Sequence, residues 1–91
     1  MIVRRQPDWV IAKFGDEAVM MSVRSDERIG LDEVALQIWE AIETPRSVDE
    51  ICNHLMKRYN VTPELCRTEV ERFLGELREH DVVEFDSPHA A

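Results

Sequence analysis

The stretch Ile29-Gly30-Leu31-Asp32-Glu33-Val34-Ala35-Leu36-Gln37-Ile38-Trp39 changes its hydrophobic period at Asp32. Before Asp32, apolar residues alternate with an arginine and a glycine, which is typical of a short, half-buried β-strand. After Asp32, apolar residues recur at spacings of one, three and four, as on the buried face of a helix, and Asp32 is the expected N-cap. The stretch therefore predicts that a β-sheet ends here and that a helical half of the chain begins.

The residues before this junction read as a three-stranded antiparallel meander. Runs rich in β-branched, aromatic and other apolar residues cover 9–14, 17–23 and 27–31, and the polar turns Gly15-Asp16 and Ser25-Asp26 separate them. A sheet this small needs a helical layer on one face to be stable.

Three helices are expected after the junction. The first stops at Thr44-Pro45, because the residue before a proline is pushed out of the helical region. Ser47-Val48-Asp49-Glu50 is a capping box that starts the second. Thr62-Pro63 starts the third, which ends near His80, and residues 82–85 resemble a short closing strand.

The expected fold is α+β and winged helix-turn-helix-like, with a three-stranded antiparallel sheet followed by three helices. Residues 1–85 form a single domain in this interpretation, and residues 86–91 form a loose C-terminal tail. The length of 91 residues, with 44% hydrophobic and 33% charged residues, fits one small domain with a modest core.

The formal net charge of -8 disfavours phosphate backbones and anionic membrane surfaces as partners. A small winged-helix DNA-binding regulator is the alternative from another functional class. Its recognition helix would be the third, which carries more glutamates than arginines and is a poor reader of a DNA groove. The prediction is no nucleic-acid partner and no membrane partner.

The N-terminus lacks the apolar segment of a signal peptide, and no run is long enough for a membrane span. Cys52 and Cys66 match no CxxC pattern and are expected to be reduced thiols in a core, with a disulfide as the lesser alternative. A cytoplasmic protein is expected.

Catalytic chemistry is not apparent in the sequence. The acidic residues fall mainly on polar helix faces, His54 lies two residues from Cys52 and so points to another face, and the three glycines are isolated. We therefore expect no enzyme activity, no metal and no cofactor.

A peptide site remains the most plausible function on physical grounds. The segment 27–31 is brief, ends the meander, and carries Gly30, where another backbone can approach closely. If this segment is a sheet edge, its unpaired N–H and C=O groups are a template for an added strand. An edge that twists away unused is an equal alternative from physics alone.

Three stretches resemble the PqqD-like proteins, the RiPP recognition elements. The junction 29–39 resembles their strand-to-helix junction. Arg46-Ser47-Val48-Asp49-Glu50-Ile51, with Leu55 and Tyr59-Asn60-Val61, is similar to their second helix. Glu69-Val70, with Phe73-Leu74, Leu77 and Val82-Val83, is similar to their third helix and the segment after it. The likeness spans about residues 9–85 and is specific because all three stretches occur in order.

This resemblance implies a non-catalytic adaptor that binds the leader segment of a ribosomally made precursor peptide and presents it to modifying enzymes. Trp39 and the junction 31–34 look most like the stand-alone elements of lasso peptide maturation, which work beside a cysteine-protease-type leader peptidase. A PqqD-type chaperone in pyrroloquinoline quinone synthesis is the close alternative.

The resemblance also implies where the leader binds, namely as a strand on the third β-strand and in the groove beside the third helix. The implied peptide-binding residues are Asp26, Glu27, Arg28, Ile29, Gly30, Leu31, Arg67, Glu69, Val70, Glu71, Phe73 and Leu74. Glu69 stands where the family often has aspartate. The helical pattern does not show which flank of the third helix faces the sheet, and Leu74 can belong wholly to the core instead.

Overall fold

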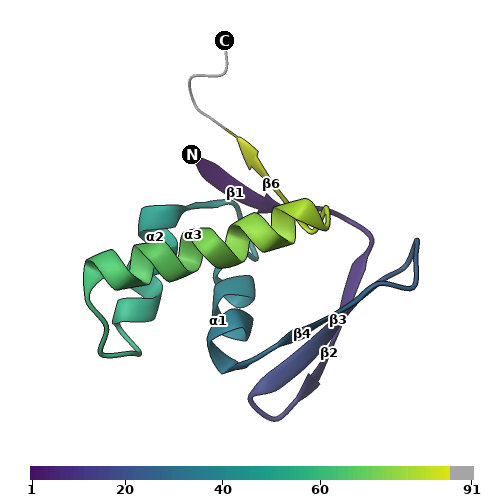
Figure 1. Cartoon of the computed structure of the whole chain (residues 1–91), viewed down its shortest axis with the longest axis horizontal. Helices are drawn as coiled ribbons and strands as arrows, with labels where there is room; N and C mark the ends of the chain where they lie inside the picture. Colours follow the sequence, from purple (N-terminus) through teal and green to yellow (C-terminus); the bar gives the residue numbers. More distant parts are fainter. Residues whose placement is uncertain (87–91) are drawn as a thin grey trace.

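The computed structural model describes residues 1–86, which form two small sheets and three helices (Figure 1). The strands are β1 (Ile2–Arg5), β2 (Trp9–Phe14), β3 (Glu17–Ser22), β4 (Arg28–Leu31), β5 (Arg46–Ser47) and β6 (Val83–Asp86). The helices are α1 (Glu33–Ala41), α2 (Val48–Met56) and α3 (Pro63–Glu79).

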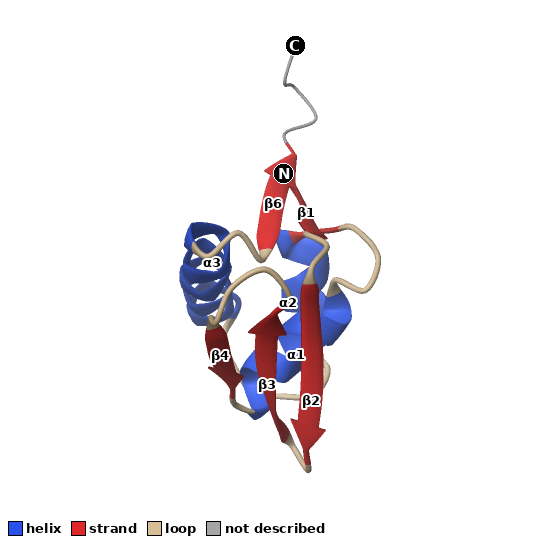
Figure 2. Cartoon of the chain, turned by 90° about the vertical axis from the view of Figure 1, so that its right-hand side faces the viewer, coloured by secondary structure: helices blue, strands red, loops and turns tan. Residues whose placement is uncertain are grey.

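The predicted meander is the sheet β2–β3–β4, in which both neighbouring pairs are antiparallel. The hairpin between β2 and β3 turns through Gly15, whose φ of 64° lies in the left-handed region that favours glycine. The helices cover one face of this sheet, and Figure 2 shows the other face toward the viewer. The α+β class and the order of sheet and helices are thus confirmed.

Each of the three predicted helix starts is present with its cap. The Asp32 carboxylate accepts a hydrogen bond from the Ala35 N–H at 2.8 Å, and the Thr62 hydroxyl accepts one from Leu65 at 3.3 Å. Ser47 and Glu50 form the expected capping box at 3.1 and 3.0 Å. The hydrogen bond from the Ser47 N–H lowers the pKa of Glu50.

The second sheet, in the order β5–β1–β6, was not predicted from the sequence, except for a closing strand near β6. β1 pairs with both of its neighbours in the antiparallel sense, and Val3 in its centre is completely buried. Arg5, the last residue of β1, donates to the Trp39 carbonyl at 2.5 Å and lies 3.9 Å from the centre of the Trp39 ring. Burial of this guanidinium lowers the pKa of Arg5. β1 thus anchors the N-terminus to α1 and to the C-terminal strand.

The core lies where the inner face of β2–β3–β4 meets the apolar stripes of the helices. Met20, Leu31, Ile51 and Leu74 are each at most 2% exposed there. The predicted tail begins at Asp86, which is the last residue of β6, and the rest of the tail lies outside the described residues.

Candidate peptide-binding groove

β4 is an edge strand, and its hydrogen-bond pattern defines which backbone groups are open. The Ser22 N–H donates to the Glu27 carbonyl at 3.1 Å, just before β4 begins. Hydrogen-bonded and non-hydrogen-bonded pairs alternate along an antiparallel ladder. Because Met20 is opposite Ile29 and Ala18 is opposite Leu31, those two β4 residues bond to β3. The N–H and C=O groups of Arg28 and Gly30 therefore point to the free edge.

The side chains of β4 point alternately to the two faces of the sheet. Ile29 is half-buried and packs against the core, and Leu31 is 2% exposed within it. Arg28 and Gly30 belong to the opposite face. A Cβ added to Gly30 would meet nothing within 4 Å, and the φ of Gly30 lies outside the left-handed region. Neither the backbone nor the packing within the chain thus requires a glycine at this position.

A groove of about 440 Å³ lies beside this edge and has α3 as its other wall. The residues that line it come from β4, from α1 and its N-cap, and from one flank of α3: Gly30, Asp32, Val34, Ala35, Ile38, Glu69, Arg72, Phe73 and Glu76. Arg72 pairs with Glu69 at 3.1 Å and with Glu76 at 2.7 Å. The hydrogen bond with Glu69 and the negative charges of Glu69 and Glu76 raise the pKa of Arg72. The α3 wall is therefore a row of alternating charges beside the Phe73 ring.

A smaller apolar pocket of about 200 Å³ continues the groove toward the loop between α2 and α3. The two cavities share Val34, Ile38 and Glu69, and the remaining lining residues of the smaller one are Leu55, Tyr59, Val61, Leu65, Cys66 and Val70. Leu65 is 54% exposed even though it is a large apolar residue. An apolar side chain that enters this pocket would cover Leu65, and its binding would be favourable because apolar surface is removed from water on both sides.

Two polar contacts link the elements that surround the groove. The Tyr59 hydroxyl donates to the Glu33 carboxylate at 2.8 Å, and this hydrogen bond raises the pKa of Tyr59. His80 Nδ1 lies 2.7 Å from the Glu27 carboxylate and so links the end of α3 to the residue before β4. The first contact joins the segment after α2 to α1, and the second joins the end of α3 to the sheet.

The structure shows which flank of α3 faces the sheet. Glu69 and Phe73 line the groove, whereas Arg67 pairs with Asp49 of α2 and, at 3.5 Å, with Glu71 on the opposite flank. The proposed residues Arg67 and Glu71 thus lie away from the groove.

Two of the remaining proposed residues, Val70 and Leu74, belong to the buried stripe of α3. Val70 is 1% exposed and forms part of the apolar pocket. Leu74 is 0% exposed and belongs to the hydrophobic core cluster. Leu74 packs in the core of this structure, whereas Val70 reaches the pocket wall.

Of the α3 residues that line the groove, the sequence predicts Glu69 and Phe73 but not Arg72 and Glu76. It also does not predict the contribution of α1, because Val34 and Ile38 belong to the apolar stripe that is expected to face the core. Leu65 offered a signal, because it is an apolar residue outside the stripe that contains Cys66 and Val70. An apolar residue beside a complete core stripe indicates a second surface on that helix.

The thiols and the charged groups of the described residues form no metal-binding cluster of three or more His, Cys, Asp or Glu side chains. Cys52 and Cys66 are free and buried. Burial, together with contact with Cys66, raises the pKa of Cys52 to about 11, so this thiol is protonated at neutral pH. Within residues 1–86, no helix has the length and apolar character needed to cross a membrane.

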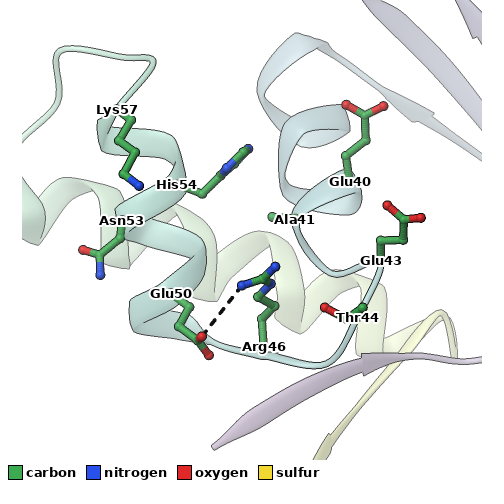
Figure 3. A pocket seen from close by; sticks show the side chains of 9 residues that line it. All are labelled: Glu40, Ala41, Glu43, Thr44, Arg46, Glu50, Asn53, His54 and Lys57. Atoms are coloured by element: carbon green, nitrogen blue, oxygen red, sulfur yellow. Dashed lines mark ion pairs between the residues drawn. The ribbon is translucent and has the colours of Figure 1, made fainter.

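A polar hollow of about 490 Å³ lies elsewhere, between the end of α1, β5 and α2 (Figure 3). Glu40 and Glu43 stand on one side of it, and His54 and Lys57 on the other. Arg46 lies 3.8 Å from Glu50 at the N-terminus of α2. None of the predicted site residues lines this hollow.

Comparison with known proteins bears on the groove. The profile of the PqqD family, described as coenzyme PQQ synthesis protein D, matches residues 17–83. The chain belongs to the PqqD family. The matched segment runs from β3 to the first residue of β6 and therefore contains both walls of the groove. No curated protein matches the sequence.

Two solved structures share the fold of this PqqD-family chain. One is described as "TbiB1 in Complex with the TbiA(beta) Leader Peptide", with a TM-score of 0.83 and 24% identity, over 92% of this chain and 98% of that chain. The other is "Lasso peptide synthetase B1 complexed with the leader peptide", with a TM-score of 0.80 and 19% identity, over 91% of this chain and 98% of that chain. The match includes nearly the whole length of each chain, so the overall fold is common to all three.

Proposed function

We propose that the chain is a non-catalytic adaptor that binds the leader segment of a ribosomally made precursor peptide, by strand addition to β4, in lasso peptide maturation. One observation carries this proposal: the outward N–H and C=O groups of Arg28 and Gly30 stand beside an open groove. The two structures that share the fold support it, because both are complexes with a leader peptide.

In this proposal the backbone and the side chains of the leader have separate roles. Main-chain hydrogen bonds to Arg28 and Gly30 provide affinity that is independent of sequence. Alternate leader side chains point inward, between β4 and the groove flank of α3 that carries Phe73. An apolar leader residue fills the pocket beside Leu65 and provides sequence specificity.

The chain brings its cargo to a separate enzyme, for which we propose a leader peptidase of the cysteine-protease type. The groove is lined by carboxylates, one guanidinium and apolar groups, none of which is a strong nucleophile. Tethering would raise the local concentration of the precursor at the partner to about the millimolar range. The chain thereby accelerates a reaction that it does not catalyse.

A second candidate function is a PqqD-type role in the synthesis of pyrroloquinoline quinone. The family profile itself favours it, since the profile is that of coenzyme PQQ synthesis protein D. The same groove would serve in both cases. The two functions therefore differ in the peptide that is bound and not in the fold.

Titration of labelled peptides against the full chain tests the proposal. Fluorescence anisotropy would be measured with three synthetic probes: the TbiA(beta) leader, a coenzyme PQQ precursor, and the leader of the precursor encoded nearest to this chain's gene. Saturable binding of a lasso leader supports the first function, and binding of the PQQ precursor alone supports the second. Binding of none of the three would overturn both.

Two controls accompany this titration. Leu65→Gln, at an exposed position of the pocket, is expected to weaken binding of the cognate leader about five- to tenfold without lowering the melting temperature. Random duplex DNA is the probe for a regulator. Tight DNA binding that falls by orders of magnitude with added salt would favour that class instead.

A further inference from the structure

The face of the β2–β3–β4 sheet that points away from the helices is largely apolar, and no helix or further strand of the described residues lies over it (Figure 2). We call this surface the outer sheet face. It is made by Val10, Ala12 and Phe14 of β2, by Glu17, Val19 and Met21 of β3, and by Arg28 and Gly30 of β4. Phe14 is 65% exposed and Val10 is 48% exposed. These large apolar side chains are therefore exposed to solvent and are not packed in the core of the fold.

The apolar residues of the outer sheet face are contiguous. Val10 is opposite Met21, and Ala12 is opposite Val19, so their side chains are cross-strand neighbours on this face. On the β4 side, Val19 is opposite Gly30, which has no side chain to cover it. Single exposed apolar residues are ordinary, but a contiguous patch of this kind marks an interaction surface.

Two opposite charges lie at opposite ends of the patch. Glu17 lies at the hairpin end of β3, and Arg28 lies at the far end of β4. Neither side chain forms an ion pair within residues 1–86. A two-fold axis that lies between two such faces, perpendicular to the strands, would bring Glu17 of each copy next to Arg28 of the other. An axis parallel to the strands would instead place Glu17 against Glu17.

We propose that a second copy of this chain docks on the outer sheet face and forms a two-fold, face-to-face dimer. In such an isologous contact the same surface of both copies is buried, so the surface must be complementary to itself. The outer sheet face meets this condition, because Glu17 pairs with Arg28 of the other copy and the apolar centres face each other. The face spans two strands of six residues and one of four. Its flat area is at most roughly 200 Å², which is less than the roughly 800 Å² per partner of a standard interface. The dimer is therefore weak, with a dissociation constant in the range of about 10 µM to 1 mM.

Dimerisation leaves the peptide site open. The free backbone groups of Arg28 and Gly30 point along the plane of the sheet, whereas the partner copy lies above that plane. The dimer thus presents two grooves and does not rest on the proposed function. A failure of peptide binding would leave it standing.

Sedimentation equilibrium of the full chain, between 10 µM and 2 mM at 0.15 M salt, tests the dimer. The average mass is expected to rise from the chain mass of 10.6 kDa toward twice that value. Phe14→Ser is expected to raise the dissociation constant at least about tenfold, since it removes the same apolar contact twice per dimer. Leu65→Ser is the matched control, because Leu65 is also a half-exposed apolar residue but lies on α3. It should change dimerisation less than twofold.

Charge reversal tests the orientation. Glu17→Arg and Arg28→Glu should each weaken the dimer, and the double variant should restore it, because both pairs are then reversed together. A chain that remains monomeric at 2 mM would overturn the proposal. Association that survives Phe14→Ser, or a double variant that is no tighter than the single ones, would also overturn it, since the contact would then lie elsewhere.

Discussion

On one flank of α3, Arg67 pairs with Asp49 of α2, and Arg78 lies 5.2 Å from the centre of the Phe85 ring in β6. On the other flank, Glu69 and Phe73 face β4 across an open groove. Both flanks carry glutamates and arginines in ion pairs along the helix, so composition does not distinguish them.

The difference between the flanks comes from their neighbours. α2 and β6 already occupy one side of α3, and their contacts with it are made within the chain. The groove flank faces α1 and β4 across the open groove, and the free hydrogen-bonding groups of β4 belong to Arg28 and Gly30. Substitutions on the two flanks should therefore affect different properties: fold on the first, and peptide affinity on the second.

The largest effect is expected from Leu74, in the buried stripe between the two flanks. Leu74→Ala should lower the free energy of unfolding by about 2–5 kcal/mol, because it leaves a cavity in a completely buried site. Urea denaturation measures this loss. Peptide affinity of the folded fraction should stay within twofold of the parent. A variant that keeps its stability but loses affinity would move Leu74 to the groove wall.

The next effect concerns the edge strands of the sheet. Gly30→Pro removes an outward N–H from β4 and places a ring at the edge, so leader affinity should fall at least about 30-fold. Lys13→Pro is the matched control on the other edge strand, β2. The Val23 N–H donates to the Asp8 carbonyl, and hydrogen-bonded pairs alternate from there along β2, so the Lys13 N–H points to the free edge. Its affinity should change less than twofold.

Ile29→Pro separates edge loss from sheet loss. The Ile29 N–H points to β3, so this variant should lower the melting temperature as well as the affinity. Equal affinities for Gly30→Pro and Lys13→Pro, measured by anisotropy, would remove β4 as the peptide-binding edge.

The local parts of this fold were predictable from the sequence, for reasons that the caps illustrate. Ser47, Thr62 and Asp32 act on N–H groups three residues away, so the signal and its effect lie within one stretch of sequence. The meander was predictable in the same way, because the short turn at Gly15 joins strands that pair with each other.

The non-local parts were not predictable in that way. β1 is four residues long and finds its partners, β5 and β6, in the second half of the chain, so no local pattern announces it. The groove flank of α3 likewise depends on where β4 lies in space. The resemblance to the PqqD family supplied the strand and the helix of the site, but Arg67 and Glu71 show that it did not supply the flank.

A smaller effect compares one residue from each flank. Phe73→Ala removes a half-buried ring from the groove wall and should weaken leader binding about five- to tenfold. Arg67→Ala should leave the affinity within twofold and lower the melting temperature slightly, since it removes exposed ion pairs to Asp49 and Glu71. Calorimetric titration and thermal unfolding on both variants measure the two properties. The opposite assignment of effects would mean that the leader lies on the α2 side.

The smallest effect concerns charge and compares Glu69 with Glu71. Glu69→Gln removes a negative charge from the groove, so a probe leader with an added inward-facing lysine should bind about two- to threefold more weakly, and one with an added glutamate more tightly by a similar factor. Glu71→Gln removes the same charge from the other flank and should change neither affinity. Both differences should shrink at 0.5 M salt, because screening shortens the reach of exposed charges. If the two variants shift both probes equally, the leader senses only the net charge of -8 and not the groove flank of α3.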